Sequence, residues 1–480
     1  MRNSLTGIFF PFLLTLMFFF NDKSSNYKDY IIIIIFLGYL IFLYFKEKRY
    51  LMKYSYIIFY ITTNILGVFI IEIGSFYLTE LDIYSFKVNS LLLLVLVHVI
   101  FMETIRLLNR DNPIKDITFI DSSYILIGKR KINKLRVIEL LLVIIFIMYL
   151  VLFLNVANKP FFLVQLDRFL YQEQYLSNLE EKIGNSFLYL SPLISIYLYK
   201  TKSKKVYLLL GIVSLYFFWI GHKFSFFLNM CYIVFLPYLW YGSYKILNNI
   251  LRKSMLLIVV LIIIISFQSS IVYKRDFNEN AEYLKMRLAQ QGQLWWATYS
   301  VTKEGDNNID KLDDELRTFY KFSNSKEEIY NSGIYKIMKL TTPYDIFLRK
   351  VDDKNSRYAY STQASIYYYF KASGLIIFSL FTAFFFYLIT KKLTESIVNI
   401  NIVEAILYAR LWLIFGRVLM QSDFNKLFSV EVLFILLILM ILKLIKRNYV
   451  TNKKIIKQTQ LPLIRQSSNN LKYKIAEKHL

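Results

Sequence analysis

The chain has 480 residues, of which 56% are hydrophobic and 18% aromatic, and it carries a formal net charge of +24 at pH 7. A soluble protein this apolar would lack the polar side chains to cover its core, and the low counts of Gly (14) and Pro (7) exclude disordered, fibrous and collagen-like chains. The composition therefore indicates an integral membrane protein whose apolar side chains face lipid. The net charge is compatible with nucleic-acid binding or with membrane topology, and its distribution along the chain decides between them.

Apolar runs that could cross a membrane as helices recur about twelve times along the chain. A hydrocarbon layer about 30 Å thick needs roughly 20 apolar residues per helix, and slightly fewer when polar ends reach the interface. The runs are residues 4–20, 30–45, 56–78, 90–105, 137–156, 184–199, 206–221, 224–241, 255–273, 374–390, 402–420 and 429–445. Because they are apolar on all sides, they predict an all-α polytopic integral membrane protein. The first run lacks the small-residue cleavage site of a signal peptide, so we expect it to be retained.

The charged residues fall unevenly on the two sides of the membrane when the runs alternate in direction from a cytoplasmic N-terminus. The segments assigned to the cytoplasm hold 31 Lys and Arg against 6 Asp and Glu, whereas the short external loops hold 8 against 9. The cytoplasmic segments are residues 1–3, 46–53, 106–136, 200–205, 242–254, 391–401 and 446–480. This excess follows the positive-inside rule and predicts a protein of the cytoplasmic (inner) membrane with both termini in the cytoplasm. The net charge therefore reflects orientation, and no nucleic-acid partner is expected.

The runs divide the chain into four regions. These are residues 1–273 with nine transmembrane helices, 274–371 as a large extracytoplasmic loop, 372–445 with three more helices, and 446–480 as a basic cytoplasmic tail. The loop holds 16 basic and 14 acidic residues, and loops of this length are exempt from the positive-inside rule. It is far longer than an ordinary connection, which favours a functional segment over a linker.

The chain contains no soluble-enzyme motif, whether a P-loop, a dinucleotide-binding glycine pattern or a Cys-x-x-Cys pair. The single cysteine, Cys231, lies in an apolar run and the three histidines are scattered, so we expect neither a metal site nor a cofactor. The adjacent Asp pairs at 313–314 and 352–353 are interpreted as solvated surface charge.

A tight turn, Gly221-His222-Lys223, joins two successive apolar runs on the external side. One interpretation is a polar turn whose Lys223 reaches the membrane interface. The other is a site where a fixed cation and a titratable imidazole face an anionic headgroup, with His222 as a catalytic candidate and Lys223 as a binding candidate.

The external loop opens with a second concentration of polar residues. Apolar residues from Phe277 to Leu288 recur near helical spacing, so we expect an amphipathic helix on the membrane surface or across a cavity mouth. Arg287 falls on another face with Gln290 and Gln291, at i, i+3 and i+4. The planar guanidinium of an Arg side chain is suited to binding phosphate, and Gln amides and Trp ring faces are suited to binding sugars. The alternative for Trp295 and Trp296 is anchoring at the level of the lipid headgroups, which needs no ligand. The candidates for substrate binding are Arg275, Gln290, Gln291, Gln293, Trp295 and Trp296, and those for catalysis are Glu282 and Arg287.

Charged residues inside the apolar runs form a third group. Arg410 and Arg417 lie in the run 402–420, and intramembrane charges are costly enough to make them catalytic candidates. Arg417 lies near the external end, with Asp423 and Glu431 as candidate ion-pair partners.

Four further polar residues belong to earlier runs and loops. Glu72 and His98 are explained by hydrogen bonds inside the membrane domain. Glu80 and Asp82 form an acidic pair in an external loop and are low-ranked candidates for a base.

The architecture resembles that of the Wzy-type oligosaccharide repeat-unit polymerases, which serve O-antigen and capsular polysaccharide biosynthesis. The resemblance covers most of the chain in helix number, the large late external loop and the aromatic-rich composition. At the level of motifs it rests on the Gly-x-Lys turn at 221–223 and on Arg-Leu-Ala-Gln-Gln-Gly-Gln-Leu-Trp-Trp at 287–296. It implies a metal-independent glycosyltransferase that moves a polyprenyl-diphosphate-linked glycan onto another lipid-linked repeat unit at the outer face. It also implies a flippase and a chain-length regulator as partners, beside the lipid bilayer.

The chemistry of an external site agrees with this resemblance. Nucleotide sugars do not reach the outer face, so an activated donor must arrive on a lipid, and its diphosphate leaving group needs cationic stabilisation. The cations that could supply it are Arg275, Arg287, Arg410, Arg417 and Lys223. The groups that could deprotonate an acceptor hydroxyl are Glu282, Asp276 and His222.

Other classes of protein fit the sequence less well. A lipid-linked oligosaccharide flippase or transporter would carry cations through the depth of the membrane and short loops, whereas deep charges here are few and one loop is large. The related O-antigen ligases use a loop His, and residues 274–371 contain none. A non-catalytic scaffold leaves Arg410 and the Arg-Gln-Trp segment unexplained.

Overall fold

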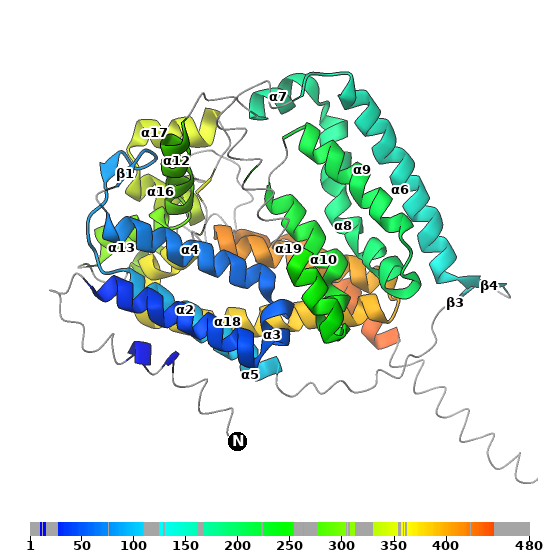
Figure 1. Ribbon diagram of the computed structural model, residues 1–480, viewed down its shortest axis with the longest axis horizontal. Helices are drawn as coiled ribbons and strands as arrows, with labels where there is room; N and C mark the ends of the chain where they lie inside the picture. The colour runs from blue at the N-terminus through cyan, green and yellow to red at the C-terminus, as the bar shows by residue number, and fades with distance from the viewer. Residues whose placement is uncertain are drawn as a thin grey trace, which may run out of the picture. The chain divides into compact units, whose positions relative to one another are not determined.

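The computed structural model describes residues 10–11, 13–15, 27–74, 76–109, 124–127, 130–161, 168–221, 224–253, 263, 276–303, 305, 308–312, 330–353, 357–358, 360, 362–422 and 424–445. The chain forms two compact units, Met1–Leu427 and Phe428–Leu480. In the second unit, residues 430–445 are helical. The first unit contains the elements that matter for a functional site (Figure 1).

The first unit is built almost entirely of helices. Up to residue 241 the elements are α2 (Lys28–Lys46), α3 (Lys48–Lys53), α4 (Ser55–Ile73), β1 (Tyr77–Leu78), β2 (Ile83–Tyr84), α5 (Leu91–Asn109), β3 (Tyr124–Ile127), β4 (Arg130–Asn133), α6 (Lys134–Ala157), α7 (Arg168–Tyr175), α8 (Asn178–Thr201), α9 (Lys205–Trp219) and α10 (Phe224–Tyr241). They continue with α12 (Phe277–Ala289), α13 (Gln293–Thr302), η2 (Ile309–Lys311), α16 (Gly333–Thr341), α17 (Tyr344–Leu348), η3 (Arg349–Asp353), α18 (Thr362–Val398), α19 (Ile402–Gln421) and η4 (Phe424–Phe428). The strands make two short antiparallel hairpins, with Tyr77 opposite Tyr84 and Tyr124 opposite Asn133.

Five helices in the described part of the chain are long and apolar enough to cross a membrane: α2, α4, α5, α6 and α18. Two shorter apolar helices, Lys205–Trp219 and Ser225–Tyr241, coincide with further predicted runs. The protein is therefore a helical membrane protein, as its composition predicts. The predicted runs 4–20 and 255–273 and the tail 446–480 lie wholly or almost wholly outside the described residues.

Several helix boundaries differ from the predicted runs for local reasons. The run 56–78 is too long, because Gly74 is extended and leads into the β1–β2 hairpin. The run 184–199 is too short, because Ser177 and Glu180 form a capping box that starts α8 at Asn178. α18 begins at Thr362, twelve residues before the predicted run, and is broken at Lys371.

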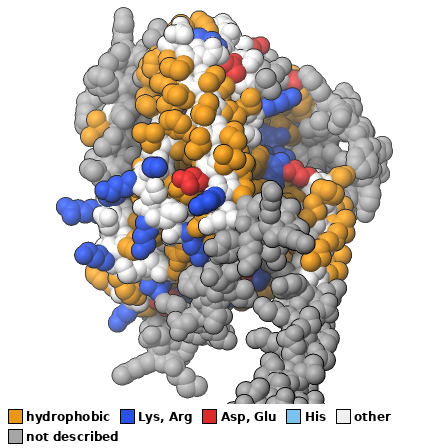
Figure 2. All heavy atoms as spheres, turned by 90° about the vertical axis from the view of Figure 1, so that its right-hand side faces the viewer, with side chains coloured by type: hydrophobic (Ala, Val, Ile, Leu, Met, Phe, Trp, Pro, Cys, Tyr) orange, Lys and Arg blue, Asp and Glu red, His pale blue; other side chains and the backbone are white. Residues whose placement is uncertain are grey.

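The helices differ in how much of their surface the protein covers. In α5, 78% of the residues in its most apolar 18-residue segment are buried inside the protein, and this helix packs against α18, α4 and α2. In α6 only 28% of the corresponding segment is buried, and the exposed side chains include Leu140, Ile144, Ile147 and Leu154. Figure 2 views the side of the molecule on which α6 and α9 lie in Figure 1, and hydrophobic side chains predominate there. A surface of this kind is suited to contact with lipid tails.

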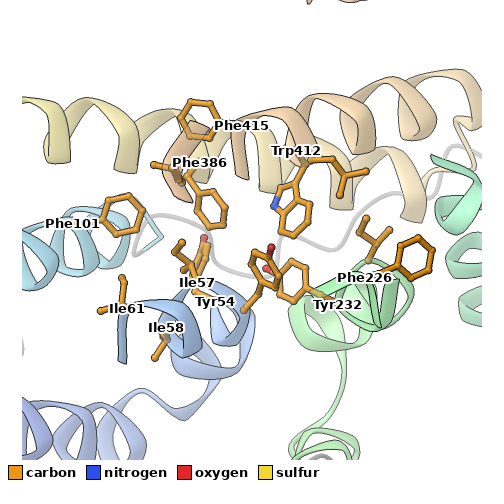
Figure 3. Close-up of a cluster of buried hydrophobic side chains, with 14 of the residues drawn as sticks. Tyr54, Ile57, Ile58, Ile61, Phe101, Phe226, Tyr232, Phe386, Trp412 and Phe415 are labelled. Atoms are coloured by element: carbon orange, nitrogen blue, oxygen red, sulfur yellow. The ribbon is translucent and has the colours of Figure 1, made fainter. Parts of the chain in front are cut away.

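A cluster of aromatic side chains fills the centre of the helical unit (Figure 3). Trp412 of α19 stacks on Tyr232 of α10 at a centroid distance of 5.1 Å and an interplanar angle of 17°. The ring centre of Phe386 on α18 lies 6.3 Å from that of Trp412 and 6.4 Å from that of Tyr54, the residue between α3 and α4. Part of the aromatic excess in the sequence therefore serves core packing.

The carboxylate of Glu72, at the end of α4, forms the N-terminal cap of α5. It accepts hydrogen bonds from the backbone N–H groups of Val88 (2.8 Å), Asn89 (3.0 Å) and Ser90 (2.7 Å) and from the Ser90 hydroxyl (2.8 Å). Free N–H groups at a helix start need such acceptors, and a negative charge there also complements the helix dipole. The interpretation of Glu72 as a hydrogen-bonded buried carboxylate is confirmed.

We expect Glu72→Gln to destabilise the protein by about 2 kcal/mol, because an amide offers one acceptor oxygen where the carboxylate offers two, and it carries no charge. The measurement is the apparent unfolding temperature in detergent. Glu173→Gln, at an exposed position of α7, is the control and should change it little. Equal unfolding temperatures for both variants would contradict this role of Glu72.

Candidate functional site

The start of the predicted external loop folds into two helices that lie against one end of α4. α12 begins behind Asp276, whose carboxylate accepts the Glu279 N–H at 2.7 Å, while the Glu279 carboxylate accepts the Asp276 N–H at 3.0 Å. The predicted helix is thus confirmed, and Asp276, a candidate base, acts as its N-cap. Figure 1 shows α12, α16 and α17 gathered near β1 at this end of α4.

The turn between α12 and α13 touches α4 backbone to backbone. A Cβ atom built on Gly67 would lie 2.5 Å from the Leu288 carbonyl oxygen and 2.8 Å from the Gly292 nitrogen. One built on Gly292 would lie 2.3 Å from the Val68 nitrogen. Only glycine fits at both positions, which gives Gly292 of the predicted motif a structural reason.

A chain of hydrogen bonds continues from this turn into the helices. The Asn64 amide donates to the Gln291 carbonyl oxygen at 2.7 Å, and Asn64 Oδ1 lies 3.2 Å from His98 Nε2. The interpretation of His98 as a hydrogen-bonded core histidine is therefore confirmed.

Trp295 and Trp296 are buried beneath the turn, with relative exposures of 1% and 0%. Trp295 Nε1 donates to the Ser90 carbonyl oxygen at 3.2 Å, and Trp296 Nε1 donates to that of Phe86 at 3.1 Å. Both rings are covered by protein atoms in this structure, and substrate binding and interfacial anchoring by the two Trp residues stay predictions. The two indoles attach α13 to the segment that leads into α5.

Arg287 projects from the exposed side of α12 and is held in place by its neighbours. Its Nε donates to the Tyr283 hydroxyl at 2.9 Å and its Nη1 donates to Gln290 Oε1 at 3.2 Å. The Gln291 amide donates to the Arg287 carbonyl oxygen at 3.2 Å. The prediction that Arg287, Gln290 and Gln291 lie together is confirmed by these hydrogen bonds. Their role in substrate binding stays a prediction.

Gln293 belongs to a separate polar cluster centred on Glu80. The Glu80 carboxylate accepts hydrogen bonds from the Gln293 amide and from Lys350 Nζ, and its backbone carbonyl accepts the Tyr358 hydroxyl at 2.7 Å. Lys350 Nζ also lies 4.5 Å from the centre of the Tyr358 ring, and Thr342 donates to the Tyr358 hydroxyl at 3.2 Å. Burial, assisted by the Glu80 charge, raises the pKa of Tyr358. The cluster joins the β1–β2 hairpin, α13 and η3, so Glu80 connects segments far apart in sequence.

The break in α18 serves the same assembly. Lys371 has a φ of 54° and a ψ of −154°, a region that non-glycine residues rarely occupy. Its Nζ donates to the carbonyl oxygen of Thr302, the last residue of α13. The residue with the strained backbone, Lys371, thus supplies a hydrogen-bond donor to a free carbonyl oxygen at the C-terminal end of α13.

The remaining candidates of the motif regions are dispersed. Glu282 is 65% exposed and forms an ion pair with Lys285 at 3.6 Å. His222, Lys223 and Arg275 lie outside the described residues, although Gly221 before the turn has a φ of 66°.

Arg410 and Arg417 lie on α19, which packs against α8. The Arg410 guanidinium lies 4.0 Å from the centre of the Tyr189 ring on α8, a cation–π contact. Arg417 is seven residues later, about 10 Å further along the same side of the helix, and its side chain is exposed. Of the predicted partners, Glu431 belongs to the second unit and Asp423 lies outside the described residues.

A small cavity lies between α4, α5, α18 and α19. It has a volume of about 30 Å³, and its polar lining residues include Tyr60, His98, Tyr360, Gln363 and Ser379. This is room for about two water molecules, so the cavity cannot hold a sugar ring. Among the residues that the structure describes, no three His, Cys, Asp or Glu side chains are placed to hold a metal ion.

Sequence reasoning missed Lys350 and ranked Glu80 low. Nothing in the sequence around Lys350 distinguishes it from other loop lysines, and its partner is 270 residues away. The density of Tyr and basic residues after Tyr335 was the only available signal.

Comparison with known proteins gives one match. Residues 327–436, less than a quarter of the chain, match the model of a family of unknown function (DUF6418). The matched segment includes Lys350, Arg410 and Arg417 but not Arg287. No curated protein and no solved structure matches the chain.

We expect Gly292→Ala to displace the α12–α13 turn from α4, because the added methyl group would overlap the α4 backbone. Overpacking of this kind typically costs about 1–3 kcal/mol. The measurement is the apparent unfolding temperature together with the rate of proteolysis within α12.

Gly38→Ala, on α2, is the matched control, since a Cβ there meets nothing within 4 Å. It should be neutral or slightly stabilising, because alanine favours a helix over glycine. Indistinguishable stabilities of the two variants would refute the close contact.

Proposed function

We propose that the protein is a membrane polysaccharide polymerase. It joins polyprenyl-diphosphate-linked oligosaccharide repeat units at the outer face of the cytoplasmic membrane during capsule or O-antigen biosynthesis. The observation that carries the proposal is the placement of Arg287. This cation is exposed, is held by Tyr283 and Gln290, and stands on a helix whose last turn packs against Gly67 of a membrane-length helix.

The proposed topology has about twelve transmembrane helices, cytoplasmic termini and an external loop at 274–371. It is supported by the charge distribution along the sequence and by the five long apolar helices. In this topology the Glu80 cluster and Arg287 lie at the external end of α4.

In the proposed reaction, an acceptor hydroxyl oxygen attacks the anomeric carbon of the donor sugar. The bond from that carbon to the diphosphate oxygen breaks, polyprenyl diphosphate leaves, and the hydroxyl proton passes to a base. Arg287, Arg410 and Arg417 would stabilise the negative charge that develops on the leaving group. Among the described base candidates, Glu282 on α12 is exposed and does not cap a helix, whereas the Asp276 carboxylate caps α12. His222, the third base candidate, lies outside the described residues.

The loop also offers a surface suited to sugars. Basic groups lie over Tyr rings at Arg287–Tyr283 (5.1 Å) and Arg357–Tyr335 (4.8 Å). Such pairs combine aromatic faces with hydrogen-bond donors, which carbohydrate recognition uses.

Deletion of the gene should leave single lipid-linked repeat units and abolish the polymer, and complementation with the unmodified gene should restore the chain-length ladder. Complementation with Arg287→Ala should reduce polymer at least about 10²-fold, the usual effect of removing one group that stabilises transition-state charge. Arg349→Ala is the control, since that Arg is exposed and paired with Asp345. A normal ladder in the deletion strain would exclude a polymerase, whereas lipid-linked polymer would indicate a ligase.

A reporter fused at Asn308 should report an external location, and one fused at Asn399 should report a cytoplasmic one, because these positions lie on opposite sides in the proposed topology. The measurement is the activity of reporters that function on only one side of the membrane. If both fusions report the same side, the proposed orientation of α18 is incorrect.

A further inference from the structure

A second group of basic side chains lies where α3, α5, α10 and α18 meet, at the opposite end of α4 from Arg287. Arg49 and Lys53 come from α3, and Lys391 comes from α18. Lys53 is buried, with a relative exposure of 7%. Burial, followed by the charges of Arg49 and Lys391, lowers the pKa of Lys53 to about 8. The positive charges of Arg49 and Lys391 therefore both act on Lys53.

The hydrogen bonds of these cations go to neutral oxygens. Arg49 Nη2 donates to the Gly242 carbonyl oxygen at 3.1 Å, and Lys53 Nζ donates to Asn109 Oδ1 at 3.2 Å. Lys391 Nζ lies 3.4 Å from the Tyr387 hydroxyl. The partners of Arg49 and Lys53 solvate these two cations but do not neutralise their charge.

The nearby carboxylates are already engaged elsewhere. Glu47 accepts Arg106 Nη1 at 2.6 Å, and Glu103 accepts Arg106 Nε at 2.8 Å. Glu103 also accepts the Tyr39 hydroxyl at 2.7 Å. Arg106 thus balances the charges of Glu47 and Glu103, the two carboxylates adjoining α3 and the end of α5.

Buried donors without acceptors surround the same cations. Among the residues that the structure describes, Arg49 Nε, the Tyr54 hydroxyl and Trp240 Nε1 are buried and have no hydrogen-bond partner. Lys53 Nζ lies 4.5 Å from the centre of the Trp240 ring, and that ring lies 6.1 Å from Tyr54. Buried donors of this kind are costly unless an acceptor reaches them.

We propose that these five residues, Arg49, Lys53, Tyr54, Trp240 and Lys391, form a binding site for a phosphate group, which we call the basic aromatic site. A phosphate brings both the missing negative charge and several acceptor oxygens. Cationic residues near the cytoplasmic surface attract anionic phospholipids, and the three cations of the site lie in two segments, 46–53 and 391–401, for which the sequence predicts a cytoplasmic location with an excess of Lys and Arg. A phospholipid headgroup and free phosphate share this chemistry, and the experiment separates them.

The test uses the full-length protein purified in detergent. Addition of phosphatidylglycerol should raise the apparent unfolding temperature by several degrees, whereas phosphatidylcholine at the same concentration should not. Inorganic phosphate is added in a parallel series and compared with chloride at equal ionic strength. Native mass spectrometry counts the phosphatidylglycerol that stays bound.

Arg49→Gln combined with Lys53→Met should abolish both the shift and the retained lipid. The matched control is Lys392→Gln, because Lys392 is the neighbour of Lys391 but is 51% exposed and paired with Glu395 at 2.7 Å. If the double variant does not fold, Trp240→Phe keeps an aromatic ring, removes the N–H donor and should reduce the shift by at least half.

A shift reproduced by inorganic phosphate supports the site with a soluble ligand, and a shift confined to phosphatidylglycerol supports it with a lipid ligand. No shift with either compound overturns the proposal. An equal shift in the unmodified protein and in the folded variants overturns it as well. Neither outcome depends on polymerase activity.

Discussion

The contact between Gly67 and Gly292 determines how the loop end of the molecule is assembled. It brings the α12–α13 turn against α4 closely enough that the added Cβ atoms would overlap backbone atoms. Once this turn is placed, the Gln291 carbonyl oxygen reaches Asn64, and the two indoles below it reach the carbonyl oxygens of the segment before α5. Arg287 is then presented outward at a defined position relative to a membrane-length helix. A surface residue thus obtains its place from a contact in which no side chain takes part.

Buried and half-buried carboxylates make three further long-range connections among the described residues. Glu72 joins α4 to the start of α5, Glu80 joins the hairpin to α13 and η3, and Glu103 joins α5 to Tyr39 of α2. Each charge is balanced by helix N–H groups or a cation, which is the condition for burying a carboxylate at acceptable cost. These three acidic residues therefore have structural roles, which leaves the exposed carboxylate of Glu282 as the described base candidate at the proposed external end.

The two ends of the helical unit differ in how their cations are balanced. At the loop end, Lys350 pairs with Glu80, and exposed Arg287 is held by neutral oxygens. At the other end, Arg49, Lys53 and Lys391 adjoin buried donors, while Arg106 has taken up the nearby carboxylates. The proposed glycan site and the proposed phosphate site thus rest on separate groups of residues. Net charge alone could not separate them, since both ends contribute to the same total.

The sequence by itself determined that the protein is helical and membrane-embedded, where most helices run, and that Arg287, Gln290 and Gln291 lie together at the end of one helix. These properties depend on composition and on spacings of three or four residues, which act locally along the chain. Hydropathy also misplaced the ends of α4 and α8, because an extended glycine and a capping box set those boundaries. Only the tertiary structure decided that Trp295 and Trp296 are buried, that Gly292 must be glycine and that Glu80 pairs with Lys350. Those outcomes depend on partners about 200 or more residues away, and such contacts are selected by packing and by the need to satisfy buried polar groups.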